Sequence, residues 1–312
     1  MVLVTGGTGF IGQTVIRRLA EAGRQIRILL RPSQHSPNLP QGIAVEVAIA
    51  SMLDKRGVRA ALVGVESVVH LASAEAHGRE PELQAVDIQG TAVLAAAARQ
   101  AKVDRLIFLS HLGADLSSAF PVLRAKAIAE QSIQRSSVPA TILRTSLAYG
   151  PGDRFTSAIA MLLSISPLVF PLPGNGTTAL QPIWVEDLAT CILWSLEEPA
   201  MAGQTYEIGG PEFLTIEQLT QLIRRVTGTR RWVVHTSPVS VRALAWMMQR
   251  LLPRSPLTTF ALDYLATSRM ASLDALPRIF GLKPAILEQK LGYLRGRNWG
   301  VELLRRQLGW RR

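Results

Sequence analysis

The chain has 312 residues, a formal net charge of +11 and a hydrophobic content of 48%. This length is enough for one large domain or for a domain with an added lobe, and the apolar content excludes an intrinsically disordered protein. The single cysteine, Cys191, excludes an internal disulfide and a cysteine-based metal site, so we expect no bound metal. No apolar run is long enough to span a membrane. Because the first predicted strand follows Met1 directly, we also expect no signal peptide.

The first element along the chain is a β-branched run at 2–5, followed by three spaced glycines and an amphipathic stretch at 12–22. Gly6 allows a tight turn, Gly9 lets the backbone approach a pyrophosphate, and Gly12 lets the helix pack close to the strand. The start of the helix presents unpaired N–H groups and the positive end of its dipole to the phosphates. This strand, turn and helix predict a dinucleotide-binding site.

Strand-like and helix-like segments then alternate up to about residue 150. The predicted strands are 2–5, 26–30, 44–47, 67–71, 105–110 and 140–144, and the predicted helices are 12–22, 53–63, 84–100 and 123–135. Apolar strands interleaved with helices indicate an α/β fold with a doubly wound, Rossmann-type parallel sheet. In such a sheet the cofactor lies across the carboxyl ends of the strands.

The later part of the chain differs from this pattern, because Pro- and Gly-rich loops give way to helices. We expect residues 1–150 and about 183–205 to form the dinucleotide-binding core. Residues 151–182 and 206–312 are expected to form a smaller lobe that covers the cofactor cleft and contacts a substrate or partner. The chain shows no internal repeat and no low-complexity linker.

The end of the second predicted strand bears on which nicotinamide cofactor is bound. NAD-preferring sites usually place a carboxylate there to bind the ribose 2′-hydroxyl, whereas this chain has Leu30 followed by Arg31. A guanidinium can pair with a 2′-phosphate, which a carboxylate would repel. We therefore expect NADP(H) rather than NAD(H). The alternative is that Arg31 is a solvated charge at a strand end.

Several motifs resemble the extended and atypical short-chain dehydrogenase/reductase superfamily, whose members are NAD-dependent epimerase/dehydratase-like, over essentially the whole chain. They include TGGTGFIG at 5–12, HLA at 70–72 and YGPGD at 149–153. A narrower similarity, in SHLGA at 110–114 and QPIWVED at 181–187, is to the NAD(P)H-binding accessory subunit of respiratory complex I and its bacterial relatives. That resemblance implies tight NADPH binding without established turnover, and some relatives are tied to quinone biosynthesis.

The resemblance also implies a set of site residues. It assigns cofactor contacts to Thr5, Gly6, Gly9, Phe10, Ile11, Gly12, Arg31, Leu71, Ala72, Ser110 and Lys126. Asp87 stands where many relatives have a structural asparagine, so a different internal hydrogen bond is expected there.

Active members of the superfamily use a Tyr-x-x-x-Lys pair with an upstream Ser or Thr, and the tyrosine serves as general acid and base. Lys126 matches the lysine, but Val122 stands at the tyrosine position, and the hydroxyl position falls near His111, next to Ser110. No residue is therefore named as catalytic, and His111 and Lys126 stay candidates. A histidine near its ordinary pKa suits proton transfer, but a loop histidine that only lines the cleft is the favoured interpretation.

Two functional hypotheses remain. The first is a non-turnover NADP(H)-binding accessory or assembly subunit of a membrane or respiratory complex, in which the cofactor stabilises the fold. The second is an NADPH-dependent reductase or epimerase acting on a hydrophobic carbonyl or a quinone-pathway intermediate, with His111 or water supplying the proton. Val122 favours the first.

Two basic, aromatic segments indicate a partner. The segment 241–252 is predicted to be a helix in which Trp246, Met247 and Met248 are exposed or half-exposed between two arginines. The segment 290–312 holds seven basic residues against one glutamate. Both suggest docking to an anionic membrane surface or to an acidic subunit of a membrane complex; an ordinary lobe helix and a solvated tail are the alternative.

We expect no nucleic-acid partner, because no groove-reading element is recognised. The expected location is cytoplasmic, with peripheral attachment to the inner face of the membrane left open.

Overall fold

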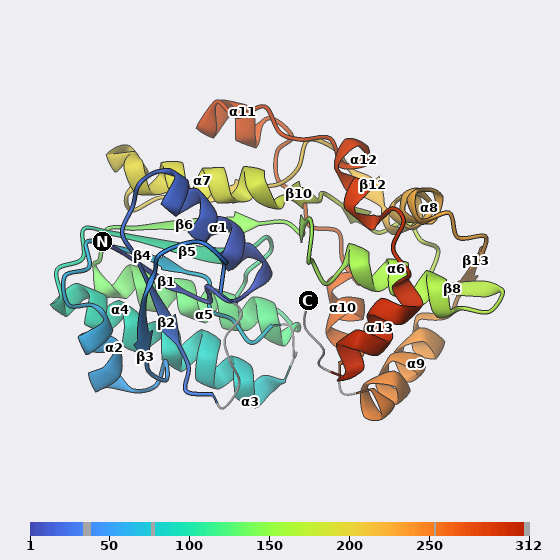
Figure 1. The fold of residues 1–312 in the computed structure, drawn as a ribbon, viewed down its shortest axis with the longest axis horizontal. Helices are drawn as coiled ribbons and strands as arrows, with labels where there is room; N and C mark the ends of the chain where they lie inside the picture. Colours follow the sequence, from blue (N-terminus) through green and yellow to red (C-terminus); the bar gives the residue numbers. More distant parts are fainter. Residues whose placement is uncertain (34–38, 76–78, 253, 309–312) are drawn as a thin grey trace. The chain divides into compact units, whose positions relative to one another are not determined.

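The computed structural model describes residues 1–33, 39–75, 79–252 and 254–308 (Figure 1). The chain divides into two compact units, each assembled from three separate stretches. Unit 1 comprises Met1–Thr145, Val185–Ile208 and Asp274–Lys283, and unit 2 comprises Ser146–Trp184, Gly209–Leu273 and Pro284–Arg312.

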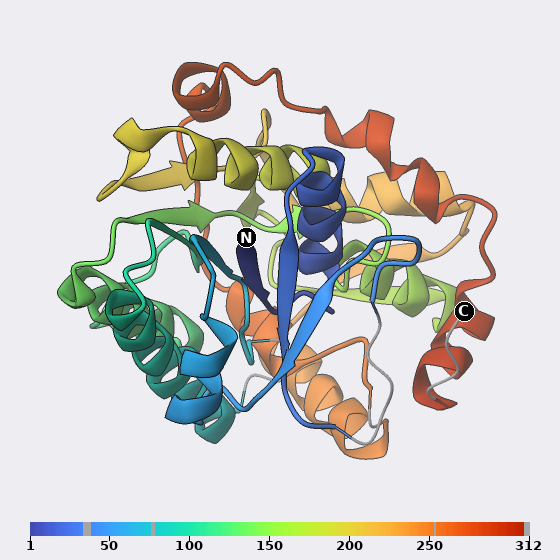
Figure 2. The same ribbon diagram turned by 60° about the vertical axis from the view of Figure 1, so that its left-hand side comes forward.

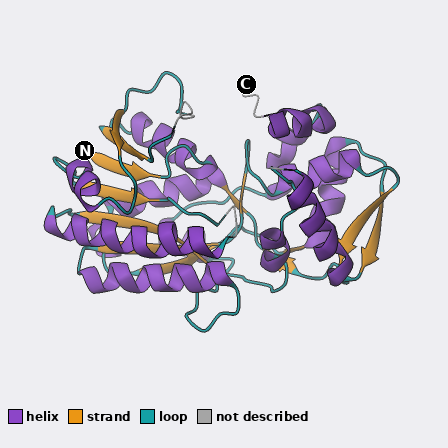
Figure 3. Cartoon of the chain, turned by 90° about the horizontal axis from the view of Figure 1, so that it is seen from below, coloured by secondary structure: helices purple, strands orange, loops and turns teal. Residues whose placement is uncertain are grey.

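Unit 1 is built on a seven-stranded parallel sheet with the order β11-β6-β5-β4-β1-β2-β3. Helices α1 and α7 cover one face, and α2, α4 and α5 cover the other (Figures 2 and 3). The strands are β1 Val2–Thr5, β2 Ile26–Leu30, β3 Glu46–Ile49, β4 Ser67–His70, β5 Arg105–His111, β6 Ala140–Thr145 and β11 Thr205–Ile208. The helices are α1 Phe10–Glu21, α2 Lys55–Ala61, α3 Glu80–Leu83, a π-helix Gln84–Gly90, α4 Thr91–Gln100, α5 Pro121–Ser136, α7 Val185–Glu197, a 3-10 turn Pro199–Met201 and α11 Ala275–Phe280.

The expected Rossmann-type α/β fold is confirmed, and five of the six predicted strands lie within one residue of their observed bounds. The third is shifted toward the carboxyl side, to Glu46–Ile49 instead of 44–47. The seventh strand, β11, pairs with β6 but was not predicted as a strand. Asp274–Lys283 also belongs to unit 1, whereas we expected it in the smaller lobe. In this segment, the centre of the Phe280 ring lies 6.2 Å from the centre of the Tyr206 ring.

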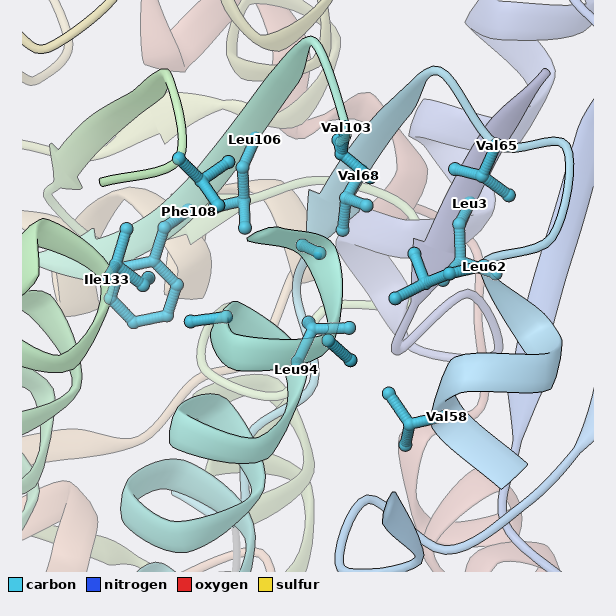
Figure 4. Packing of buried hydrophobic residues seen from close by; sticks show 14 of the residues in the cluster. Leu3, Val58, Leu62, Val65, Val68, Leu94, Val103, Leu106, Phe108 and Ile133 are labelled. Carbon is cyan, nitrogen blue, oxygen red and sulfur yellow. The ribbon is translucent and has the colours of Figure 1, made fainter. Parts of the chain in front are cut away.

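One face of the sheet forms a continuous apolar core with the helices that cover it (Figure 4). Leu3, Val68 and Leu106 project from adjacent strands, and Leu94 of α4 and Ile133 of α5 pack against them. All five side chains are fully buried. Central parallel strands need this apolar cover on both faces, which is why they are apolar along most of their length.

Unit 2 is made of short strand pairs and helices. The strands are β7 Ala148–Tyr149, β8 Val169–Pro173, β9 Ala179–Leu180, β10 Ile183–Trp184, β12 Leu214–Thr215 and β13 Trp232–Thr236, paired as β7–β10, β8–β13 and β9–β12. The helices are α6 Thr156–Ile165, α8 Ile216–Thr227, α9 Pro238–Leu251, α10 Thr259–Tyr264, α12 Leu287–Lys290, a 3-10 turn Leu291–Leu294 and α13 Trp299–Leu308.

The C-terminal segment is part of the core of unit 2. Leu291, Leu294 and Trp299 are buried in the same apolar cluster as Leu163 and Leu219. The alternative of a solvated tail is therefore wrong for 290–308, and residues 309–312 lie outside the described residues. In the part of the chain that the structure describes, no helix is both long and apolar enough to cross a bilayer.

We predict that Leu94→Ala lowers the free energy of unfolding by about 2–5 kcal/mol, because it leaves a cavity between α4 and the sheet. Leu304→Ala, at a position that is 63% exposed, is the matched control and should cost less than about 0.5 kcal/mol. Urea denaturation of both variants measures the difference. Equal losses would contradict the assigned core.

Candidate functional site

The glycine-rich turn after β1 is the point of closest backbone packing in unit 1. Gly6 has a φ of +72°, and a Cβ there would lie 2.7 Å from the backbone of Leu71 and Ala72. A Cβ on Gly12 would lie 2.3 Å from the carbonyl oxygen of Gly6. Neither position tolerates a side chain, so the start of α1 packs directly on the turn, as the sequence predicts.

This turn fits the pyrophosphate of a dinucleotide. Gly9 caps α1 in an extended conformation and, because it has no side chain, accepts no side-chain hydrogen bond from the first turn of the helix. The N–H groups at this end, in Phe10, Ile11 and Gly12, therefore combine with the helix dipole to favour an anion. Gly9 is exposed, and the first turn carries no acidic residue that would repel phosphate.

Arg31 lies directly after β2 with its side chain exposed, and it makes no ion pair with any described residue. Its guanidinium is thus not committed to a carboxylate. Leu71 and Ala72 are half-buried in the loop that follows β4, against Gly6. These placements are compatible with the cofactor contacts predicted for all three residues, which stay predictions.

The Thr5 side chain is engaged within unit 1, and its contact with the cofactor stays a prediction. Its hydroxyl is buried, lies 2.7 Å from Nδ1 of His70 and accepts a hydrogen bond from the Ala72 N–H. Nε2 of His70 lies 2.8 Å from the Thr91 hydroxyl. The result is a buried chain Thr5–His70–Thr91 that joins β1, β4 and α4 beneath the turn. Burial, helped by the charge of Lys126, lowers the pKa of His70 to about 3, so its imidazole is neutral.

Lys126 sits in a buried charged cluster on the same unit. Its ammonium lies 3.2 Å from Oδ1 of Asp87 and 3.8 Å from Oε2 of Glu75, and its side chain is 4% exposed. Burial opposes the charged form, but the two carboxylates more than compensate and raise the pKa of Lys126. The lysine is a fixed cation, and its nearest partners are carboxylates rather than a tyrosine.

A π-helical turn positions Asp87. The segment Gln84–Gly90 departs from α-helical geometry, a feature common at functional sites. Besides Lys126, the Asp87 carboxylate accepts hydrogen bonds from the Ser73 hydroxyl at 2.6 Å and from the Ala74 N–H at 2.8 Å. The acid thus ties the loop after β4 to Lys126.

Glu75 links Lys126 to His111. Nε2 of His111 lies 2.7 Å from Oε2 of Glu75, the oxygen that faces Lys126. Burial alone would raise the pKa of Glu75, but His111 and Lys126 together hold it well below its ordinary range. Glu75 was not predicted as a site residue, because it belongs to no motif. The sequence shows only that an acidic residue stands in the loop after β4.

Ser110 faces a second cluster. Its hydroxyl donates to Glu130 at 2.5 Å, and Glu130 accepts from the guanidinium of Arg144 at 2.7 Å. The Ser110 hydroxyl is thereby committed to an ion pair on α5 and β6. Val122, one turn before Lys126 on α5, is buried. The structure therefore joins two of these residues, His111 and Lys126, through Glu75, and it gives the Ser110 hydroxyl a different partner.

Comparisons with known proteins agree with this geometry. Family models described as "NAD(P)H-binding" and "NAD dependent epimerase/dehydratase family" match residues 6–153 and 121–209. The chain is 30% identical to the NADH dehydrogenase [ubiquinone] 1 alpha subcomplex subunit 9 of Arabidopsis thaliana, over 70% of this chain and 56% of that protein. It thus spans little more than half of that relative. The Mus musculus protein of the same name is 27% identical over 99% of this chain and 80% of its own length.

Two further matches are of a different kind. The 2-alkyl-3-oxoalkanoate reductase of Stenotrophomonas maltophilia is 29% identical over 91% of this chain and 95% of its own length. The structure of a UDP-glucose 4-epimerase from Thermotoga maritima superimposes with a TM-score of 0.74 and 22% identity, over 98% of this chain and 99% of that one, and shows the fold alone.

The fold and the glycine-rich turn define a protein of the nicotinamide dinucleotide-binding class. Within it, the chain matches the NAD(P)H-binding and the epimerase/dehydratase families over parts of its length, which is consistent with the atypical short-chain dehydrogenase/reductase superfamily.

We predict that the buried His70 makes unfolding pH-dependent. Its pKa is about 3 in the folded protein and 6.5 in the unfolded chain. As the pH falls below about 6.5, only the unfolded state takes up this proton, so stability is lost at up to about 1.4 kcal/mol per pH unit. Urea denaturation between about pH 7 and pH 5 should show the loss, and His70→Gln should reduce its slope.

His235→Gln, at an exposed position on β13, removes a histidine without touching the buried chain and is the matched control. An equal change of slope in both variants would show that His70 is not the residue responsible.

Proposed function

We propose that this protein binds NADP(H) as a tightly held structural ligand and serves as a non-turnover accessory or assembly subunit of a membrane-associated, respiratory-type complex. The observation that carries the proposal is Val122. A buried side chain without an exchangeable proton stands one turn before Lys126, where active members of the superfamily have their tyrosine.

The surroundings of Lys126 support this proposal. A lysine that assists a catalytic tyrosine acts on that hydroxyl, but here Asp87 and Glu75 are the nearest partners of the ammonium. Lys126 and Gly6, Gly9 and Gly12 would hold the cofactor, and Arg31 would pair with its 2′-phosphate. A ligand that binds only the folded state stabilises the protein by mass action. The complex I subunits among the relatives favour the accessory role.

We expect the protein to bind NADPH more tightly than NADH, and Arg31→Ala to weaken NADPH binding about tenfold with little effect on NADH, because only NADPH carries the 2′-phosphate. Isothermal titration calorimetry measures both affinities. Arg59→Ala, at an exposed position on α2, makes the same change in charge and is the control. Equal affinities of the unmodified protein for the two cofactors would overturn the preference.

We also propose that unit 2 docks to an anionic membrane surface. Helix α9 exposes Val239, Trp246, Met247 and Leu251 on one side, and the Arg250 guanidinium lies 5.3 Å from the centre of the Trp246 ring. Exposed apolar side chains beside arginines suit insertion among acidic headgroups. Helix α13 adds exposed Leu304 and Leu308 beside Arg305. Such a protein would be cytoplasmic and peripheral on the inner face of the membrane.

The membrane proposal predicts that Trp246→Ser combined with Leu251→Ser weakens sedimentation with phosphatidylglycerol vesicles about tenfold or more, because two inserting side chains are lost. Val63→Ser, which removes a side chain 70% exposed in unit 1, is the control. Unchanged binding of the double variant would remove α9 from the docking surface. Deletion of 290–312 is unsuited to this test, since Leu291, Leu294 and Trp299 belong to the core of unit 2.

The pair His111 and Glu75 favours a second function, an NADPH-dependent reductase for a hydrophobic carbonyl or a quinone-pathway intermediate. With Glu75 ionised, Nε2 of His111 donates a hydrogen bond to it at 2.7 Å. This carboxylate–histidine pair is suited to holding and delivering a proton. The relative named 2-alkyl-3-oxoalkanoate reductase fits this alternative. When bound, NADPH would supply the hydride.

The two functions are separated by adding 2-alkyl-3-oxoalkanoates or quinones to the NADPH complex and following absorbance at the nicotinamide band. The accessory role predicts no sustained oxidation. Turnover of about 1 s⁻¹ or more, within the range of ordinary enzymes, that is abolished in His111→Ala would establish the reductase instead. The variant must retain its calorimetric affinity for NADPH, so that loss of turnover is not loss of binding.

A further inference from the structure

Unit 2 contains an apolar cavity of about 230 Å³ that no feature of the cofactor site uses. Its walls come from α6, β8, α8, α9 and α10 and from the loop before α10 (Figure 1). Ala158 and Leu162 of α6, Leu244 and Met248 of α9, and Leu262 of α10 are among the lining residues. No charged side chain contributes to the lining that the structure describes.

The polar groups of the lining are already satisfied. Of the described lining residues, only Ser166 and Thr220 carry a polar side chain. The Ser166 hydroxyl donates to the carbonyl oxygen of Leu162, and the Thr220 hydroxyl donates to that of Ile216, each at 2.7 Å. The rest of the lining is hydrocarbon, so a water molecule inside would find few polar partners. The cavity therefore suits a hydrocarbon group and not a polar one.

The volume sets the length of the group that fits. An engineered apolar cavity of about 150 Å³ accommodates benzene, which has six carbon atoms. At the same space per carbon, 230 Å³ accommodates about nine carbon atoms. This matches one medium-length alkyl chain and is too small for two.

Three arginines lie near one another, and two of them stand close to lining residues along the chain. Arg154 directly precedes the lining residue Phe155, and Arg254 stands two residues before the lining residue Pro256. Arg254 donates to the carbonyl oxygen of Arg306 at 3.0 Å. Burial and the neighbouring charges of Arg154 and Arg254 lower the pKa of Arg306. None of these arginines forms an ion pair with a described acidic residue, so the group is suited to an anion.

We propose that unit 2 binds an amphiphile with a single alkyl chain and an anionic head, with the chain in the apolar cavity and the head at Arg154, Arg254 and Arg306. The apolar lining selects the chain, because nearly all of its side chains are hydrocarbon. The arginines select the head, because together they form a concentration of positive charge without an internal counter-ion. This site is independent of the nicotinamide cofactor and of the proposed subunit role.

Calorimetric titration of the full-length protein with straight-chain carboxylates and with 1-decanol tests the site. Affinity for the carboxylates should rise about fourfold for each added methylene and level off near nine carbons. Decanoate should bind more tightly than 1-decanol. An affinity independent of chain length, or equal affinity for the acid and the alcohol, would overturn the proposal.

Variants test the chain and the head separately. Ala261→Phe fills the cavity and should weaken decanoate and 1-decanol alike, whereas Ala243→Phe, on the exposed side of α9, should weaken neither. Leu262→Ala enlarges the cavity and should move the levelling-off point up by about three carbons, a gain that misfolding cannot produce. Binding by Ala261→Phe at the wild-type level, or no shift in Leu262→Ala, would contradict the assignment.

For the head group, Arg154→Gln should weaken decanoate about threefold to tenfold and leave 1-decanol unchanged. Arg225→Gln, exposed on α8, makes the same change in charge and is the control. An equal effect of Arg154→Gln on both ligands would exclude a head-group role.

The source of the amphiphile is distinguished by incubating the protein with decanoyl-lysophosphatidylglycerol or with decanoate, isolating it again and recording its native mass spectrum. Retained lysophospholipid supports the site with a single-chain membrane lipid as the source. Retention of decanoate without lysophospholipid supports it with a free single-chain acid, and retention of neither overturns it.

Discussion

The absence of side chains at Gly6 and Gly12 is the constraint on which the rest of unit 1 depends. The carbonyl of Gly6, the first turn of α1 and the loop after β4 meet where a single Cβ would lie 2.3–2.8 Å from backbone atoms. Because no side chain separates these backbones, α1 begins directly at the carboxyl end of β1. The N–H groups of its first turn lie at the same end of the sheet. Beneath this contact, the neutral His70 is hydrogen-bonded to both Thr5 and Thr91. The turn is therefore supported by β4 and α4 as well as by β1.

The second organising feature is the compensation of charge around Lys126. A buried ammonium is costly unless it is paired, and Asp87 and Glu75 provide that pairing. The pairing also connects Lys126 through Glu75 to His111. In the accessory role this network keeps the lysine charged and fixed beside the cofactor. In the reductase role the same contacts would orient His111. The two proposals therefore share these residues, and they differ in whether His111 delivers a proton to a substrate.

The sequence predicted the parts of unit 1 that local pattern determines. Continuous apolar runs and the spacing of Gly6, Gly9 and Gly12 mark the parallel strands and the first helix with little help from tertiary structure. The strand at Thr205–Ile208 was missed because the run TYEI is short, half polar and at the edge of the sheet, so its pairing with β6 is a long-range event. The same holds for Asp274–Lys283, whose place in unit 1 depends on contacts such as Phe280 with Tyr206.

Site chemistry was predictable only where a motif existed. Lys126 and Val122 could be found by their spacing, whereas Glu75 could not, since its role arises from a loop that brings it to His111. The resemblance assigned a cofactor contact to Ser110, but it did not indicate that Glu130, one turn beyond Lys126 on α5, accepts the Ser110 hydroxyl. For the C-terminal segment, the alternative of a solvated tail left out the apolar residues between the arginines. Leu291, Leu294 and Trp299 pack into the core of unit 2.

The interleaving of the two units along the chain has a consequence for biosynthesis. Unit 1 is complete only when Asp274–Lys283 has been made, and unit 2 only when the last helix has followed. A growing chain can form the early strands and helices, but unit 1 cannot close before Lys283 has left the ribosome, nor unit 2 before its last helix has followed. Chains that end before these segments therefore leave apolar surface of both units uncovered. This protein should depend more on protection during translation than one whose domains follow one another in sequence.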